Sequence, residues 1–117
     1  MVITEIADKD FNSEVLQSDI IVFACFTAAW CSSCFPTCIS AKSLAEEYCQ
    51  RIKFVRCDAE KCAATVKKYN IGVFPTIMLF QSSGMVKKLV GYKEKHSLRR
   101  VLDGYLTVSS VECKANY

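Results

Sequence analysis

The longest apolar run of the chain, Ile20 to Phe26, predicts a strand that is buried on both faces. A second buried strand is expected over Ile52 to Asp58. Between these runs, apolar residues recur at steps of three and four, which predicts a helix from about Ser33 to Gln50. The residues expected on its inner face are Cys34, Cys38, Ala41, Leu44, Ala45 and Tyr48.

Shorter elements flank this central unit. Asp10 is expected to cap a helix that runs to about Gln17 and buries Phe11, Val15 and Leu16. The other elements are expected, in order, as a strand over Val2–Ile6, a helix from Glu60 to Tyr69, strands over Ile77–Phe80 and Val86–Val90 joined by a turn at Ser82–Gly84, and a helix that buries Leu98, Val101, Leu102, Tyr105 and Leu106. The order βαβαβαββα predicts an α/β fold, a three-layer α/β/α sandwich with a central mixed sheet.

Length and composition support one globular domain. The chain has 117 residues, 51% of them hydrophobic and 23% charged, which excludes a disordered protein. We expect the domain to span residues 1–106 and residues 107–117 to form a C-terminal tail. The apolar runs are too short to cross a bilayer and no signal segment opens the chain, so no membrane association is predicted. The eight cysteines are fewer per residue than in small disulfide scaffolds, which predicts a cytoplasmic protein with mostly free thiols.

The net charge of +3 is too small to predict binding to nucleic acid, and no aromatic residues are interleaved with the basic ones. Residues 1–20 are mainly acidic and residues 84–100 mainly basic. A basic edge is able to steer acidic partners, but the simpler interpretation is a solvated face. We expect the protein to act as a monomer.

The segment Trp30-Cys31-Ser32-Ser33-Cys34 falls where the first buried strand passes into the helix. The Cys-x-x-Cys spacing brings both sulfur atoms together across one turn. Free N–H groups and the positive end of the helix dipole stabilise a thiolate on Cys31, whereas Cys34 lies on the inner face. We therefore predict a thiol–disulfide oxidoreductase in which Cys31 attacks a substrate disulfide and Cys34 resolves the mixed disulfide.

Metal binding is the alternative interpretation of these cysteines. A zinc site of two knuckles needs a second Cys-x-x-Cys, which the sequence lacks. Cys25, Cys31, Cys34 and Cys38 stay open as a ligand set for zinc or an iron–sulfur cluster, although we predict no bound metal.

Besides the Trp30-Cys31-x-x-Cys34 motif, four further segments are typical of one protein family. They are a strand ending in Asp58, Lys68-Tyr69-Asn70-Ile71, Phe74-Pro75-Thr76, and Val90-Gly91 before the last helix. With these, the sequence resembles the thioredoxin family over residues 2–106. The resemblance implies a thioredoxin-like sandwich and protein-disulfide reductase activity, with the redox-active Cys31–Cys34 pair and no bound cofactor. It also implies disulfide-containing client proteins, and electrons from NADPH through a separate thioredoxin reductase.

The resemblance also implies a substrate site. Pro75 would form a cis peptide bond opposite the active disulfide. The backbone of Phe74 would pair with an extended substrate segment beside Cys31, and Trp30, Pro75 and Gly91 would form a flat apolar docking surface.

The spacer and the buried acid depart from the family pattern. Ser32-Ser33 replaces the usual Gly-Pro, and hydroxyls that hydrogen-bond a thiolate predict a weaker reductant than typical thioredoxins. Cys25 occupies the position of a buried acid that accepts the proton of the resolving thiol. Arg56 matches a usual lysine, and we expect it to reach solvent or Asp58.

Cys25 and Cys38 are therefore candidate modulators of the dithiol. Cys25 is either a thiolate stabilised by Arg56 or a small apolar core residue. Cys38 is a third thiol one turn beyond Cys34. These departures support the rival function, a non-catalytic or metal-carrying binding module with a thioredoxin fold.

Overall fold

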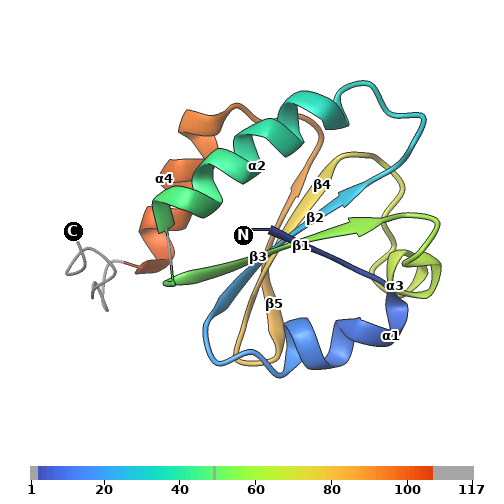
Figure 1. Ribbon diagram of the computed structural model, residues 1–117, viewed down its shortest axis with the longest axis horizontal. Coiled ribbons are helices and arrows are strands. Elements are labelled where there is room, and N and C mark those ends of the chain that lie inside the picture. The colour runs from blue at the N-terminus through green and yellow to red at the C-terminus, as the bar shows by residue number, and fades with distance from the viewer. Residues whose placement is uncertain (1–2, 49, 107–117) are drawn as a thin grey trace.

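The computed structural model describes residues 3–48 and 50–106, and within them it forms a five-stranded mixed sheet in the order β1-β3-β2-β4-β5. The elements are β1 (Ile3–Ile6), α1 (Asp8–Phe11), the π-helical turn η1 (Asn12–Leu16), β2 (Ile21–Thr27), α2 (Cys34–Tyr48), β3 (Ile52–Asp58), α3 (Ala63–Lys68), β4 (Thr76–Gln81), β5 (Gly84–Val90) and α4 (Lys95–Leu106). Helices α2 and α4 cover one face of the sheet, and α1 and α3 cover the other (Figure 1). The predicted α/β/α sandwich is confirmed. The tail predicted at residues 107–117 lies outside the described residues, as does Cys49.

Strand β2 lies in the middle of the sheet, parallel to β3 and antiparallel to β4. Every residue of β2 is buried. Phe23 and Cys25 pack under α2 and α4, whereas Val22, Ala24 and Phe26 pack against the layer of α1 and α3. This two-sided burial explains the uninterrupted apolar sequence and confirms the strand predicted there.

The carboxyl ends of β2 and β3 meet at one edge of the sheet, where Thr27 pairs with Asp58. The chain leaves β2 at this edge, passes through a loop over residues 28–33, and enters α2 at Cys34. The predicted bounds of β3 are correct. Helix α2 begins one residue later than expected, and its face of Ala41, Leu44, Ala45 and Tyr48 is buried as predicted.

The first helix starts earlier than predicted, and Asp10 is not its N-cap. Helix α1 begins at Asp8 with Ala7 in the N-cap position. The Asp10 carboxylate accepts a hydrogen bond from the Ala7 N–H at 3.1 Å, so it stabilises the helix start from within the first turn. Phe11 and Val15 are buried as expected.

Helix α3 begins at Ala63 instead of at Glu60, and its N-terminal cap comes from another part of the chain. The Asp8 carboxylate accepts hydrogen bonds from the N–H groups of Ala64 at 2.9 Å and Thr65 at 3.0 Å, and from the Thr65 hydroxyl at 2.7 Å. Burial alone would raise the pKa of Asp8, but these bonds outweigh it and hold the pKa below its usual value. Asp8 therefore joins α1 to α3 on one face of the sheet.

On the other face of the sheet, ion pairs join helices α2 and α4 and use part of the basic segment of the chain. Lys95 and Arg99 of α4 contact the carboxylate of Glu47 in α2 at 2.8 and 2.9 Å. The bonds from Arg99 and then Lys95 lower the pKa of Glu47. The basic side chains of strand β5, such as Lys87, do not take part in these ion pairs and are exposed, which agrees with a solvated face.

The cap on α3 predicts the effect of two substitutions. Asp8→Ala is expected to lower the free energy of unfolding by about 1 kcal/mol, since two N–H groups and a hydroxyl lose their acceptor. Asp8→Asn keeps an acceptor oxygen and should cost less. Because the pKa of Asp8 is lowered on folding, its advantage over Asn should hold near neutral pH and fade as the pH falls through that lowered value. Urea unfolding at pH 7 and pH 3 measures both differences, and equal stability of all three proteins at pH 7 would contradict the assignment.

Candidate active site

Cys31 and Cys34 are joined by a disulfide at the edge where β2 gives way to α2, with their Cα atoms 5.5 Å apart. The loop is closed by a hydrogen bond from the Cys31 N–H to the carbonyl oxygen of Ala28 at 3.1 Å. Cys34 is the first residue of α2 and is only 5% exposed, whereas Cys31 is partly exposed in the loop. One sulfur is therefore accessible and the other is shielded, as the two roles of a dithiol require.

A second loop approaches the same disulfide from β4. Strands β2 and β4 pair Phe26 with Thr76, so the cis Phe74–Pro75 peptide bond lies beside the end of β2. The carbonyl oxygen of Phe74 lies 3.3 Å from Cys31 Sγ. A substrate segment that crosses this site would meet the sulfur and the backbone of Phe74 together.

Gly91 holds the far side of this loop in place. Its N–H donates to the carbonyl oxygen of Pro75 at 2.8 Å, and its φ of 87° lies in the left-handed region that glycine adopts without strain. Trp30 is 75% exposed, and its ring meets the ring of Phe74 edge-on with centroids 5.7 Å apart. The structure thus brings together Trp30, Phe74, Pro75 and Gly91 near the disulfide, with Trp30 exposed, Phe74 and Gly91 partly exposed, and Pro75 buried beneath them.

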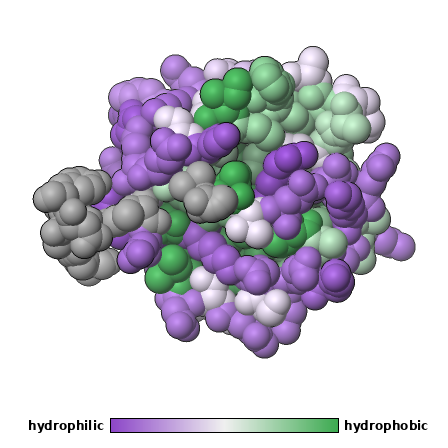
Figure 2. Space-filling view, in the orientation of Figure 1, coloured by the Kyte–Doolittle hydropathy of each residue, from purple (hydrophilic) through white to green (hydrophobic). Residues whose placement is uncertain are grey.

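An exposed aromatic ring that the sequence analysis overlooked extends this apolar area. Phe35 is 72% exposed in the first turn of α2, and Ile39 one turn later is 55% exposed. Figure 2 shows hydrophobic residues gathered over the amino-terminal end of α2, at the top of the view. The sequence contained a sign of this: Phe35 and Ile39 do not lie on the predicted buried face of the helix, and the other residues on its outer face are mostly polar.

Ser33 is the spacer residue that contacts the attacking sulfur. Its hydroxyl oxygen lies 3.5 Å from Cys31 Sγ, within reach of a hydrogen bond to a thiolate. Pro36 falls in the first turn of α2, where its missing N–H removes no helical hydrogen bond.

A cleft of about 440 Å³ opens beside the disulfide, between the end of the sheet and α2. Its lining includes Cys31, Cys34, Phe35, Cys38, Arg56 and Asp58. Cys25 lies on β2 and is fully buried, and its interaction with Cys38 shifts the pKa values of the two thiols in opposite directions. The candidate modulators Cys25, Cys38 and Arg56 are therefore gathered on one side of the active-site pair.

Of the two thiols Cys25 and Cys38, Cys38 has the lower pKa and ionises first. The interaction with Cys38, together with burial, raises the pKa of Cys25 well above its ordinary value, so Cys25 stays a thiol. The interaction with Cys25 and the nearby Arg56 guanidinium lower the pKa of Cys38 to about 7, against the opposing effect of burial. Of the two interpretations of Cys25, the structure supports the neutral residue.

Arg56 reaches solvent and a partner other than Asp58. Its side chain is 39% exposed, and a guanidinium nitrogen lies 3.7 Å from the carboxylate of Glu5 on the neighbouring strand β1. Within the described part of the chain, its buried Nε has no hydrogen-bond partner. The guanidinium thus keeps one buried N–H group without a partner among the described residues.

The other described cysteines lie on the opposite face of the sheet. Cys57 and Cys62 are fully buried in the layer of α1 and α3. Interaction with the Cys62 thiol, together with burial, raises the pKa of Cys57. The Cys62 thiol also donates to the carbonyl oxygen of Ile6 at 3.3 Å. Both residues are therefore part of the core on this face of the sheet.

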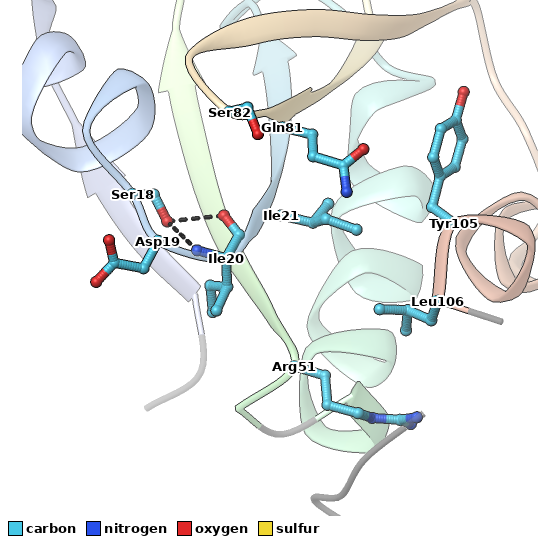
Figure 3. A pocket seen from close by; sticks show the side chains of 9 residues that line it. All are labelled: Ser18, Asp19, Ile20, Ile21, Arg51, Gln81, Ser82, Tyr105 and Leu106. Atoms are coloured by element: carbon cyan, nitrogen blue, oxygen red, sulfur yellow. Dashed lines mark hydrogen bonds between the residues drawn. The ribbon is translucent and has the colours of Figure 1, made fainter. Parts of the chain in front are cut away.

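A second cavity of about 440 Å³ lies at the far end of β2, near the β4–β5 turn and the end of α4 (Figure 3). The Ser18 hydroxyl there donates to the carbonyl oxygen of Ile20 at 2.8 Å and accepts from its N–H at 3.2 Å. The residues that line this cavity include no cysteine or histidine, so it offers no group for redox chemistry. Across residues 3–48 and 50–106, no cluster of three or more His, Cys, Asp or Glu is placed to hold a metal ion, and no helix is long and apolar enough to cross a membrane.

Comparison with known proteins agrees with this geometry. The sequence model of the family described as Thioredoxin matches residues 2–104. The chain is 30% identical to Thioredoxin of Porphyra purpurea over 107 residues, which are 92% of this chain and 100% of the relative. It is 31% identical to Thioredoxin of Staphylococcus aureus over 106 residues, covering 91% and 100% of the two chains. Thioredoxin 1 of Synechococcus elongatus is 31% identical over 101 residues, covering 86% and 94%.

Ser33 provides a test of thiolate stabilisation at Cys31. In the reduced protein at pH 7, Ser33→Ala is expected to slow alkylation of Cys31 about threefold, because roughly 0.7 kcal/mol of hydrogen bonding to the thiolate is lost. The matched control is Ser32→Ala, whose hydroxyl has no hydrogen-bond partner among the described residues. Iodoacetamide labelling with mass detection gives both rates, and an equal effect of the two substitutions would refute the role of Ser33.

The lowered pKa of Cys38 predicts its reactivity against pH. In a Cys31→Ser, Cys34→Ser background, alkylation of Cys38 should rise through a midpoint at about 7, since the reactive thiolate forms above that pKa and is lost below it. Arg56→Gln should move the midpoint upward by removing a positive charge, whereas Arg56→Lys should largely preserve it. A midpoint near the ordinary value of 9.0 in all three proteins would show that Cys38 carries no stabilised charge.

Proposed function

The chain belongs to the thioredoxin family and is a thiol–disulfide oxidoreductase, and from this premise we propose that Cys31 is its attacking thiol and Cys34 its resolving thiol. The observation that supports these roles is the difference in exposure. Cys31 is open to a client beside the Phe74 carbonyl, whereas Cys34 is 5% exposed behind it. A large disulfide-bearing protein reaches the first sulfur and not the second.

The reaction takes place in two exchanges. The Cys31 thiolate attacks one sulfur of the client disulfide, the client bond breaks, and the departing client sulfur takes up a proton. Cys34 then loses its proton and attacks Cys31 Sγ, which releases the second client thiol and closes the Cys31–Cys34 disulfide. The client gains two electrons and two protons, and the dithiol loses them. The form described above, with its closed disulfide, is the product of this cycle.

The apolar surface around the disulfide is the proposed docking site for the client. An extended client segment would lie against Trp30, Phe74 and Gly91, over the buried Pro75, with the exposed ring of Phe35 at its margin. Apolar contacts give affinity without demanding one sequence, and the Phe74 backbone aligns the segment with Cys31. This accounts for a reductase that accepts many clients.

The partners follow from the family in general terms: disulfide-containing substrates, and a reductase that returns the dithiol to its reduced form. We further propose that electrons come from NADPH through a thioredoxin reductase, that the protein acts as a monomer in the cytoplasm, and that residues 1–106 form its functional domain. The Cys31–Cys34 pair is the redox centre, so the reaction needs no bound cofactor.

Reduction of insulin with dithiothreitol as the electron source tests the two roles. Cys31→Ser is expected to abolish the activity. Cys34→Ser is expected to accumulate mixed disulfides through Cys31, which a non-reducing gel and mass mapping detect. Cys57→Ala, on the opposite face of the sheet, is the matched control and should keep most of the activity.

Two outcomes would contradict the assignment. Full activity of Cys31→Ser would remove it as the attacking thiol, and absence of any trapped client in Cys34→Ser would remove Cys34 as the resolving thiol. A purified wild-type protein that lacks the activity and contains stoichiometric zinc or iron would instead identify the rival metal-carrying module.

A further inference from the structure

The cleft beside the disulfide contains a guanidinium group whose hydrogen-bonding capacity is largely unused. Arg56 lines this cleft from β3. Within the described part of the chain its ion-pair partner is Glu5, at 3.7 Å, which is too long for a hydrogen bond, and its buried Nε has no partner. Glu5 is also shared, because Lys61 Nζ lies 3.5 Å from its other carboxylate oxygen. Arg56 is therefore able to bind a further anionic group in the cleft.

Asp58 places a carboxylate next to this guanidinium. Arg56 and Asp58 are two residues apart on β3, so both side chains lie on the face of the sheet that α2 covers, with their Cα atoms about 7 Å apart. Both residues line the cleft. One oxygen of Asp58, Oδ1, accepts a hydrogen bond from the Glu60 N–H at 2.8 Å, and the other accepts none from the described residues. The end of β3 thus offers one cation and one anion, side by side, to a ligand.

The rest of the cleft brings such a ligand to the active-site sulfurs. Cys31 and Cys34 line it, together with the small side chains of Ala28 and Ala29 and the exposed ring of Phe35. Its volume of about 440 Å³ lies within the range of small-molecule sites. Free cysteine would fill only part of this space, whereas a tripeptide thiol would fill most of it.

The two charged groups select one kind of small thiol. A peptide carries its ammonium and its carboxylate at opposite ends, but an amino acid that is linked through its side chain keeps both on one carbon atom. The γ-glutamyl group of glutathione has this form, so its carboxylate matches Arg56 and its ammonium matches Asp58. The linkage also leaves the thiol of glutathione some distance away, where it is able to meet Cys31.

We propose that the cleft binds the glutathione half of a mixed disulfide between glutathione and a client protein, and that Cys31 reduces this disulfide. The proposal rests on the proposed role of Cys31 as the attacking thiol. Trp30, Phe74 and Pro75 do not line the cleft, so the client half keeps the docking surface to itself and the two halves meet at Cys31.

The reaction balances with the dithiol as the electron donor. The Cys31 thiolate attacks the glutathione sulfur, a Cys31–glutathione bond forms, the client–glutathione bond breaks, and the client sulfur leaves and takes up a proton. Cys34 then loses its proton and attacks Cys31 Sγ, which closes the Cys31–Cys34 disulfide and releases glutathione as a thiol. The mixed disulfide gains two electrons and two protons, and the dithiol loses them.

Single-turnover reduction of a model peptide tests this site. A peptide with one cysteine and no charged side chain is joined by a disulfide to glutathione, to N-acetylglutathione or to mercaptoethanol. The first thiol carries the complete amino-acid group, the second lacks its ammonium, and the third lacks both charges. Each peptide is mixed with reduced full-length protein, and liquid chromatography measures the release of the peptide thiol. The rate with mercaptoethanol gives the reactivity of Cys31 itself, so the other rates are expressed as ratios to it.

Wild-type protein is expected to react about tenfold faster with the glutathione peptide than with the mercaptoethanol peptide, because charged groups gain hydrogen bonds in the cleft. Arg56→Gln should lower this ratio to about two, and Asp58→Asn should lower it to the ratio for N-acetylglutathione. Lys53→Gln is the matched control and should keep the wild-type ratio. It removes the same charge from the same strand, but Lys53 pairs with Glu14 of η1 on the opposite face.

Cys34→Ser shows which half of the mixed disulfide is captured. With the glutathione half held in the cleft, Cys31 should attack the glutathione sulfur, so mass mapping should find glutathione on Cys31. Peptide on Cys31 in equal or larger amount would refute this direction of attack. Glutathione on Cys38, which also lines the cleft, in place of Cys31 would refute it as well.

Binding without reaction separates a failure of this site from a failure of the proposed function. S-methylglutathione has no reactive thiol, and in NMR spectra of the oxidised protein it should shift the amide signals of Arg56 and Asp58 in wild type but not in Arg56→Gln. A protein that shows these shifts and reduces none of the three peptides would refute the role of Cys31 and leave the site in place. Equal wild-type rates with glutathione and mercaptoethanol, or an unchanged ratio in Arg56→Gln, would refute the site.

Discussion

The burial of β2 on both faces is the constraint from which the rest of the structure follows. Its backbone groups are out of reach of water, so they need ladder partners on both sides, and β3 and β4 supply them. The pairing leaves no freedom of register, because a slip by one residue would turn Cys25 to the opposite face of the sheet. The same register determines where the chain leaves the sheet and therefore where Cys31 lies.

The second half of the active site depends on the same strand. Because β4 pairs with β2, and Phe26 pairs with Thr76, the Phe74–Pro75 segment is delivered to the end of β2. The hydrogen bond from Gly91 to Pro75 then attaches the end of β5 to the site. The proposed docking surface comes from three separate segments of the chain, and the strand order brings them together.

A neutral Cys25 thiol, at the position that the sequence resemblance matches to a buried acid, determines the electrostatics behind the dithiol. A carboxylate at this depth would bring a charge into the core, whereas the Cys25 thiol stays neutral. The lowered pKa belongs to Cys38, whose thiolate is stabilised by the interaction with Cys25 and by the Arg56 charge.

The sequence alone determined the elements, their order, the α/β/α layers and the Cys31–Cys34 pair, because hydrophobic periodicity and the Cys-x-x-Cys spacing are local properties. It placed Cys25 and Cys38 on inward faces without showing that they meet. Only the tertiary structure decided that Asp8 caps α3, that Arg56 meets Glu5 instead of Asp58, and that Cys25 and Cys38 shift each other's pKa. Each of these contacts joins residues distant in the chain, and local periodicity tells which way a side chain points but not which side chain the packed layers place opposite it.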